Sequence, residues 1–192
     1  INVTGETGGS SYLDDFEASR QLIDLKSVIP WQLSGTPQLF SESQLIDNLE
    51  YGYNRAKIAF YNIDPTFYNR TGVSALPASL RSDKNEQSNH YVREIIEQEV
   101  FPFKEISVGQ SVLLPTLDIA YYPSIRGPYN YTPNGFNQNG TLLNPRTRWG
   151  GLLRRIDVND FESQNIEYIE LWLMDPFMYK TASTGGDLYF NI

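Results

Sequence analysis

The stretch "IEYIELWLMDPF", residues 166–177, is the densest apolar run in the chain and decides which fold is predicted. Its β-branched and aromatic residues show little helical periodicity, which predicts a β-strand. Successive side chains of a strand point to opposite faces of the sheet. One face would carry the apolar residues Ile169, Leu171 and Leu173, which suit the core of a β-sandwich. The other face would carry Tyr168, Glu170, Trp172 and Met174, and raises the question of what covers it.

An aromatic and acidic row of this kind has two different uses. On an open sheet, aromatic rings stack on the C–H faces of sugars while a carboxylate accepts hydrogen bonds from hydroxyl groups, as in a carbohydrate-binding module. In the other case, a helical insertion or another domain lies on the row and buries it. Helices and aromatic loops predicted elsewhere in the chain supply enough cover. We therefore expect Tyr168, Glu170 and Trp172 to form a packing or interaction face.

The rest of the chain is predicted to be mostly β with one helical part. Alternating and β-branched residues predict further strands at 111–123 and 149–156. Apolar residues at three- and four-residue steps predict a helix at 41–62, which opens with a Ser-x-x-Gln capping box, and a second helix at 89–100. Residues 63–88, which are rich in polar residues and proline, are expected to form a connecting loop.

Residues 125–148 are rich in Gly, Pro and Asn and predict a long irregular loop, of the kind that is usually functional or held by partners. The whole pattern predicts a single domain over residues 1–192. Its expected fold is a jelly-roll-like, or galactose-binding-like, β-sandwich with an inserted α-helical segment at about 41–101. The chain starts without methionine and stops in the alternating run "GGDLYFNI", so we expect a piece of a much larger chain.

Composition excludes several classes of function. The net charge is −8 and the sequence pI is near 4.6, so the chain lacks the excess of Lys and Arg that nucleic acids or anionic membranes attract. Cysteine is absent, which removes disulfides, cysteine-based zinc sites and thiol nucleophiles. No run approaches the about 20 apolar residues of a transmembrane helix. Nucleic acid is therefore not expected as a partner.

The sequence holds few groups for catalysis. The single histidine, His90, is expected at the surface, and no serine-nucleophile motif accompanies it. Two acidic clusters leave a calcium site and a glycosidase pair open as alternatives: Asp14, Asp15 and Glu17, and Asp157, Asp160 and Glu162. Because the spacing of a calcium-binding loop is missing, we expect these acids to be solvated or to cap turns. The one basic cluster, Arg146, Arg148, Arg154 and Arg155, is expected to pair with carboxylates. We predict no catalytic, cofactor-binding or metal-binding residue.

Several segments are more specific than folding alone requires. They are "SSYLDDFEASRQLIDLKS" (10–27), "YGYNRAKIAFYNIDPTFY" (51–68), "VFPFKEI" (100–106), "RGPYNY" (126–131), "NPRTRWGGLLRRIDVNDFESQNIEYIELWLMDPF" (144–177) and "GGDLYFNI" (185–192). Together these segments span nearly the whole chain. They resemble the SprA/Sov family, the very large outer-membrane proteins of Bacteroidetes that form the translocon of the type IX secretion system and support gliding motility.

The resemblance implies a non-enzymatic role in protein secretion. Members of the family form a giant β-barrel through which folded cargo passes, with a PorV-like outer-membrane protein at a lateral opening and a plug protein on the periplasmic side. The chain would be a structural domain of this translocon at the cell outer membrane, shaping or capping the pore or contacting partner subunits. The family supplies no catalytic residues. A carbohydrate-binding module that uses the aromatic face is the alternative, and a glycosidase is a more distant one.

Overall fold

The computed structural model describes residues 23–64, 76–158, 160–162, 166–178, 182–183 and 185–192. The chain divides into two compact units. One takes in Ile1–Leu25 and Arg155–Leu173, and the other takes in Lys26–Arg154 and Met174–Ile192. All helices and strands of the described residues lie in the second unit.

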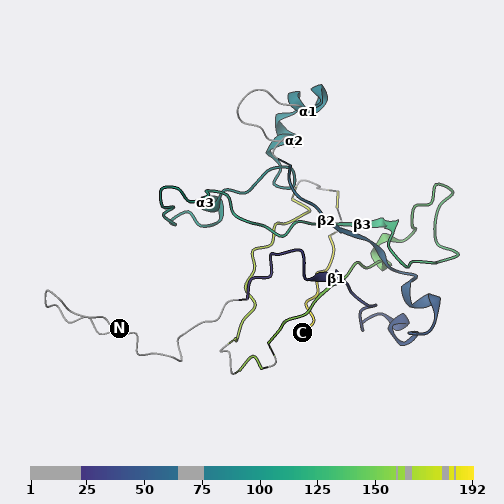
Figure 1. Ribbon diagram of the computed structural model, residues 1–192. Helices are drawn as coiled ribbons and strands as arrows, with labels where there is room; N and C mark the ends of the chain where they lie inside the picture. Colours follow the sequence, from purple (N-terminus) through teal and green to yellow (C-terminus); the bar gives the residue numbers. More distant parts are fainter. Residues whose placement is uncertain (1–22, 65–75, 159, 163–165, 179–181, 184) are drawn as a thin grey trace. The chain divides into compact units, whose positions relative to one another are not determined.

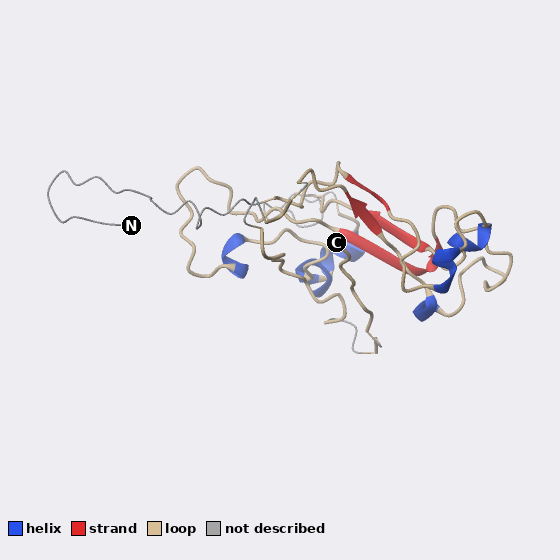
Figure 2. Cartoon of the chain, turned by 90° about the horizontal axis from the view of Figure 1, so that it is seen from below, coloured by secondary structure: helices blue, strands red, loops and turns tan. Residues whose placement is uncertain are grey.

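The described part of the second unit is built from short antiparallel strand pairs in two small sheets (Figures 1 and 2). Strand β1 (Trp31–Leu33) pairs with β4 (Leu152–Arg154), and β2 (Ala56–Phe60) pairs with β3 (Ile119–Arg126). The prediction of strands at 111–123 and 149–156 is thus confirmed in part, with shifted or shorter bounds. The few helices and the short antiparallel strand pairs agree with the coarse prediction of a mostly-β domain.

The helices among the described residues are all short, and Figure 2 shows them as single blue turns between loops. They are the 3-10 turns η1 (Ser41–Gln44), η2 (Leu49–Gly52) and η4 (Pro145–Thr147), and the α-helices α1 (Ala78–Ser82), α2 (Lys84–Ser88) and α3 (Glu97–Val100). Helices α1 and α2 fall within residues 63–88, where a loop was expected. Residues 65–75 of that stretch lie outside the described residues.

The continuous helix predicted over residues 41–62 is wrong. Asn48 accepts a hydrogen bond from the backbone of Glu50 and starts a new turn, which ends at Gly52. From Ala56 the chain runs as strand β2. Ala56 and Phe60 are four residues apart, so they fit a helical face, but with Ile58 between them they also fit the period of a strand. Pairing with β3 decides between the two periods.

The helix predicted over residues 89–100 is also wrong except for its last turn, α3. The Ile95–Ile96 segment pairs in extended form with a later part of the chain, since Leu114 donates its backbone N–H to the Ile95 carbonyl at 2.8 Å and Ile96 forms a β-bridge with Leu113. The same apolar residues that gave a helical face are β-branched, which favours this pairing.

Strand β3 carries a wide irregularity opposite the start of β2. Lys57 is paired with Tyr122, but its neighbour Ala56 is paired with Arg126. Residues 123–125 of β3, between Tyr122 and Arg126, form the bulge. The first of them, Pro123, has no backbone N–H to donate to the ladder and is therefore tolerated there. The bulge lies just before the end of β3 at Arg126, where the loop 125–148 begins.

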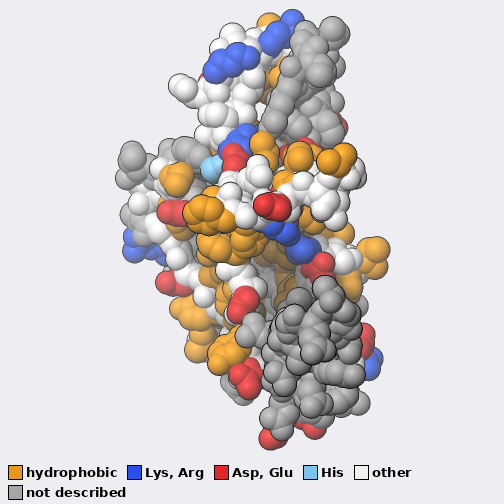
Figure 3. All heavy atoms as spheres, turned by 90° about the vertical axis from the view of Figure 1, so that its left-hand side faces the viewer, with side chains coloured by type: hydrophobic (Ala, Val, Ile, Leu, Met, Phe, Trp, Pro, Cys, Tyr) orange, Lys and Arg blue, Asp and Glu red, His pale blue; other side chains and the backbone are white. Residues whose placement is uncertain are grey.

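The two sheets are joined through Trp149, which lies just before β4. Its backbone pairs in parallel with Arg55: the Trp149 N–H donates to Asn54 at 3.1 Å and its carbonyl accepts from Ala56 at 2.8 Å. The buried apolar residues are Ala56, Leu76, Leu142 and Trp149, and no large side chain among the described residues is fully buried. The core is therefore small, and Figure 3 shows many hydrophobic side chains at the surface.

The strand predicted over residues 166–177 is not present. These residues adopt no helix or strand, and the boundary between the two units falls inside the segment, after Leu173. Among the described residues no helix is long and apolar enough to cross a membrane.

Candidate interaction face and the arginine-held loop

The row of Tyr168, Glu170 and Trp172 is open. Tyr168 is 75% exposed and Trp172 is 74% exposed, and Glu170 is exposed as well. That a helical insertion or another domain covers this row stays a prediction. The apolar side chains of the alternate positions are also open, since Ile169, Leu171 and Leu173 are 47%, 50% and 65% exposed.

Side chains on both sides of residues 166–174 are exposed, which bears on whether this segment could bind a sugar by itself. A sugar platform needs its rings held rigidly, which a strand achieves by burying its opposite face in a core. Here the opposite side chains are not buried, and the segment has no strand partner among the described residues. It is an apolar, aromatic and acidic segment that is open to a partner.

The acidic cluster near the end of the chain behaves as solvated and capping groups. Asp157 forms an exposed ion pair with Arg155 at 3.0 Å, and the Asp160 carboxylate accepts the backbone N–H of Glu162 at 3.0 Å. The other cluster, Asp14, Asp15 and Glu17, lies outside the described residues. Within the described ranges no group of acidic or histidine side chains could hold a metal ion.

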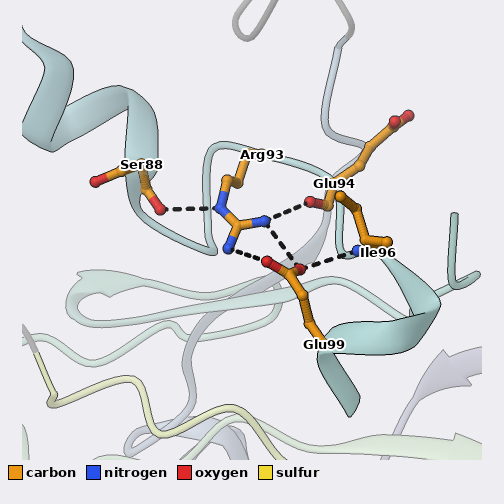
Figure 4. Close-up of polar contacts among 5 residues, drawn as sticks. All are labelled: Ser88, Arg93, Glu94, Ile96 and Glu99. Carbon is orange, nitrogen blue, oxygen red and sulfur yellow. Dashed lines mark hydrogen bonds and ion pairs between the residues drawn. The ribbon is translucent and has the colours of Figure 1, made fainter. Parts of the chain in front are cut away.

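His90 lies in the turn after α2 with intermediate exposure. Figure 4 shows a polar clamp formed by Arg93 and Glu99 between α2 and α3. The Arg93 guanidinium donates to both carboxylate oxygens of Glu99, at 3.0 and 2.9 Å, and to the backbone carbonyls of Ser88 and Glu94. Glu99 also accepts the Ile96 N–H at 3.0 Å. The hydrogen bond from Arg93 lowers the pKa of the Glu99 carboxyl. Every group of this clamp holds the backbone around α3, which indicates a structural role.

A buried arginine that sequence analysis did not single out organises the other end of the unit. Arg55 is 6% exposed, and its guanidinium donates to the carbonyls of Ser34 at 3.0 Å and Pro128 at 3.4 Å. The same group lies over the rings of Trp149 and Tyr129 at 5.0 and 5.9 Å. Burial lowers the pKa of Arg55. No sequence signal distinguishes this arginine, because its partners are carbonyls and rings from three distant segments.

Arg55 also holds the loop 125–148 through its own backbone. Its carbonyl accepts from the Gly127 N–H at 3.2 Å and from the side-chain amide of Asn130 at 2.6 Å. The Asn130 side chain, buried with its residue, in turn accepts the Thr132 N–H at 3.1 Å. A Cβ at Gly127 would collide with the backbone carbonyl of Ala56, so this close approach requires glycine.

Arg148 fastens the far end of the loop. Its Nη1 donates to the carbonyl of Tyr53 at 2.9 Å and to Oδ1 of Asn54 at 2.8 Å, and its Nε donates to Leu143 at 3.1 Å. The expected pairing of the basic cluster with carboxylates is therefore confirmed for Arg155 and is wrong for Arg148. Carbonyl groups of turns and loops are the acceptors here.

The loop is held by its backbone but presents rings outward. Tyr129 is 66% exposed and Tyr131 is 58% exposed. Tyr129 has φ of 60°, a left-handed conformation that is uncommon for a residue other than glycine. Such a conformation persists only where the surroundings fix it, as the contacts of Arg55 and Asn130 do here. The irregular loop predicted at 125–148 is confirmed, apart from the end of β3 and the turn η4.

Comparison with protein-family models gives no match for this chain, and comparison with curated proteins gives none either.

Proposed function

We propose that this chain is a non-enzymatic structural domain of an outer-membrane protein translocon of the type IX secretion system. In this role it shapes or caps the pore or contacts partner subunits, and so serves protein secretion and gliding motility. Two things support the proposal: the resemblance of its long motifs to the SprA/Sov family, and the open segment 166–174.

The observation that carries the proposal is that both sets of side chains in this segment reach solvent. Burial of apolar surface contributes roughly 25 cal/mol per Å², and an open aromatic segment forgoes that stabilisation. Exposed apolar patches of this kind usually mark surfaces that another protein covers. With only four buried apolar residues in the described part, the chain has little core of its own. A larger assembly would supply the missing cover.

The jelly-roll-like fold and the location at the outer membrane are part of the same proposal. When partners cover the open segments, the strands would complete a jelly-roll-like sandwich. The partners would be the rest of a SprA/Sov-like chain, a PorV-like outer-membrane protein, the plug protein and passing cargo. The domain would then face the periplasm, the pore or the exterior at the cell outer membrane.

A photo-crosslinking amino acid at position 172 tests the proposal in cells that assemble the complete translocon. We expect crosslinks to another part of the same chain, to the PorV-like protein or to the plug protein. The matched control is position 84, where Lys84 is exposed on the polar helix α2 and no crosslink is expected. The proposal fails if position 172 gives no more protein crosslinks than position 84.

One observation favours a second function. Tyr168 and Trp172 are open, as a carbohydrate-binding face requires. Titration of the purified chain with a panel of oligosaccharides, followed by tryptophan fluorescence, separates the two functions. A carbohydrate module would show saturable quenching that Trp172→Phe abolishes. The structural domain should show no saturable change.

A further inference from the structure

The loop 125–148 contains two Asn-Gly pairs whose surroundings differ: Asn134–Gly135 and Asn139–Gly140. A glycine after asparagine leaves its backbone nitrogen sterically open, since glycine has no Cβ to shield it. We propose that Asn139 is a site of spontaneous deamidation, in which it becomes aspartate or isoaspartate through a cyclic imide with Gly140, and that Thr141 promotes the reaction.

The reaction needs only water. The backbone nitrogen of Gly140 bonds to Cγ of Asn139 and gives its proton to solvent. The bond between Cγ and Nδ2 then breaks, and Nδ2 takes up a proton and leaves as ammonia. Water opens the imide at either of its two carbonyls, which yields aspartate or isoaspartate. No group is oxidised or reduced.

Two donors on the Asn139 side-chain oxygen favour the first step. Oδ1 of Asn139 accepts the backbone N–H of Thr141 at 3.1 Å and the Thr141 hydroxyl at 2.8 Å. Negative charge develops on this oxygen when the nitrogen adds to Cγ, so both donors stabilise the transition state as an oxyanion hole does. They also direct the amide toward the chain that follows it.

The site has room for the imide and for water. Asn139 and Gly140 are exposed, and nothing lies within 4 Å of the place that a Cβ would take on Gly140. Hydrogen bonds of the turn oppose the reaction: the Asn137 N–H donates to the Thr141 carbonyl at 2.8 Å, and the attacking Gly140 N–H donates to the Asn137 carbonyl at 2.9 Å. The hydrogen bond of Gly140 must open first, and in a short exposed turn such local opening costs little.

Asn134 provides an internal comparison. No hydrogen bond to its side-chain oxygen is formed within the described part of the chain. The carbonyl of Gly135 accepts from Leu143 at 2.8 Å and from Arg148 at 3.4 Å, which holds the backbone at this pair in the fold. We therefore expect Asn134 to react much more slowly than Asn139 in the folded chain.

The test is to incubate the purified chain in mildly alkaline buffer and to quantify aspartate and isoaspartate at both positions by peptide mass spectrometry. Product at Asn139 should accumulate about tenfold faster than at Asn134. Thr141→Val should slow Asn139 by several-fold to about tenfold, the effect of losing one hydrogen bond, while Thr141→Ser should keep the rate. In urea the two positions should react at similar rates.

The wild-type comparison does not depend on whether a variant folds. Equal rates at the two positions in the folded chain would overturn the proposal, as would an unreactive Asn139 under conditions where the urea-unfolded chain reacts. A Thr141→Val rate equal to the wild-type rate would remove the role assigned to Thr141 and overturn the proposal as stated.

Discussion

The guanidinium carbon of Arg55 lies 5.0 Å from the ring centre of Trp149, and the backbones of these two residues are paired as well. Arg55 directly precedes β2 and Trp149 lies shortly before β4, so this contact is where the two small sheets meet. Arg55 reaches the loop from the same place, through Pro128 and Asn130. A single residue thus connects both sheets to the loop that carries the exposed tyrosines.

Arg55→Lys should destabilise the chain by about 1–2 kcal/mol, although the charge is kept. An ammonium group cannot reach two carbonyls and stack on an indole at the same time, and losing the hydrogen bonds to these partly buried carbonyls costs about 1–2 kcal/mol. Urea unfolding followed by circular dichroism measures the change. Lys57→Met is the matched control, because the Lys57 side chain is exposed and its contact is with the Tyr122 ring at 5.3 Å. It should change the free energy of unfolding by less than about 0.5 kcal/mol. Equal effects of the two substitutions would contradict the role of Arg55.

Gly127→Ala should destabilise the chain by about 2–3 kcal/mol, since the added methyl group would overlap the Ala56 carbonyl and force two backbone segments apart. Gly109→Ala is the control. Gly109 has φ of 92° and nothing lies within 4 Å of the position that an added methyl group would take, so only conformational strain of about 1 kcal/mol is expected there. Thermal unfolding measures the loss of stability in both variants. A Gly109 variant as unstable as the Gly127 variant would contradict the steric explanation.

The accuracy of the sequence predictions depended on how local the deciding interactions were. The loop at 125–148 and the strand around Ile119 were predictable because proline, glycine and alternation act over a few residues. The helix expected at 41–62 was not, since Ala56 and Phe60 fit two periods and a distant strand selects one of them. Arg55 was missed for a related reason, because its partners Ser34 and Pro128 are far away in the sequence.

The Glu99 carboxyl predicts a dependence of stability on pH. Arg93 lowers its pKa from the ordinary value of 4.5, so the folded state binds this proton less readily than the unfolded state does. The stabilisation is therefore fully present above the unfolded pKa and is lost as the pH falls through the folded pKa. Because the pair is partly exposed, we expect at most about 1 kcal/mol. Urea unfolding at neutral and acid pH should show that Glu99→Gln loses stability at neutral pH and differs little from wild type in acid.

The control for this prediction is the exposed pair Arg155–Asp157. Asp157→Asn should leave the free energy of unfolding at neutral pH nearly unchanged, because an ion pair between two well-solvated side chains contributes little. If the free energy of unfolding of Glu99→Gln changes between neutral and acid pH as much as that of the wild type, the clamp in Figure 4 does not stabilise α3.

Replacing the open aromatic residues should change association without changing stability. Tyr168 and Trp172 are mostly exposed, so the double substitution Tyr168→Ser and Trp172→Ser removes little buried surface and should shift the free energy of unfolding by less than about 0.5 kcal/mol. If the chain belongs to the proposed translocon, the same substitutions should weaken secretion, because a partner would lose its contact with the rings. Trp149→Phe is the opposite case: Trp149 is buried and contacts both Phe40 and Arg55, so the loss of its indole should cost about 1–3 kcal/mol. If the double serine variant unfolds as readily as the Trp149 variant, the segment is packed in solution and the proposed interaction face is wrong.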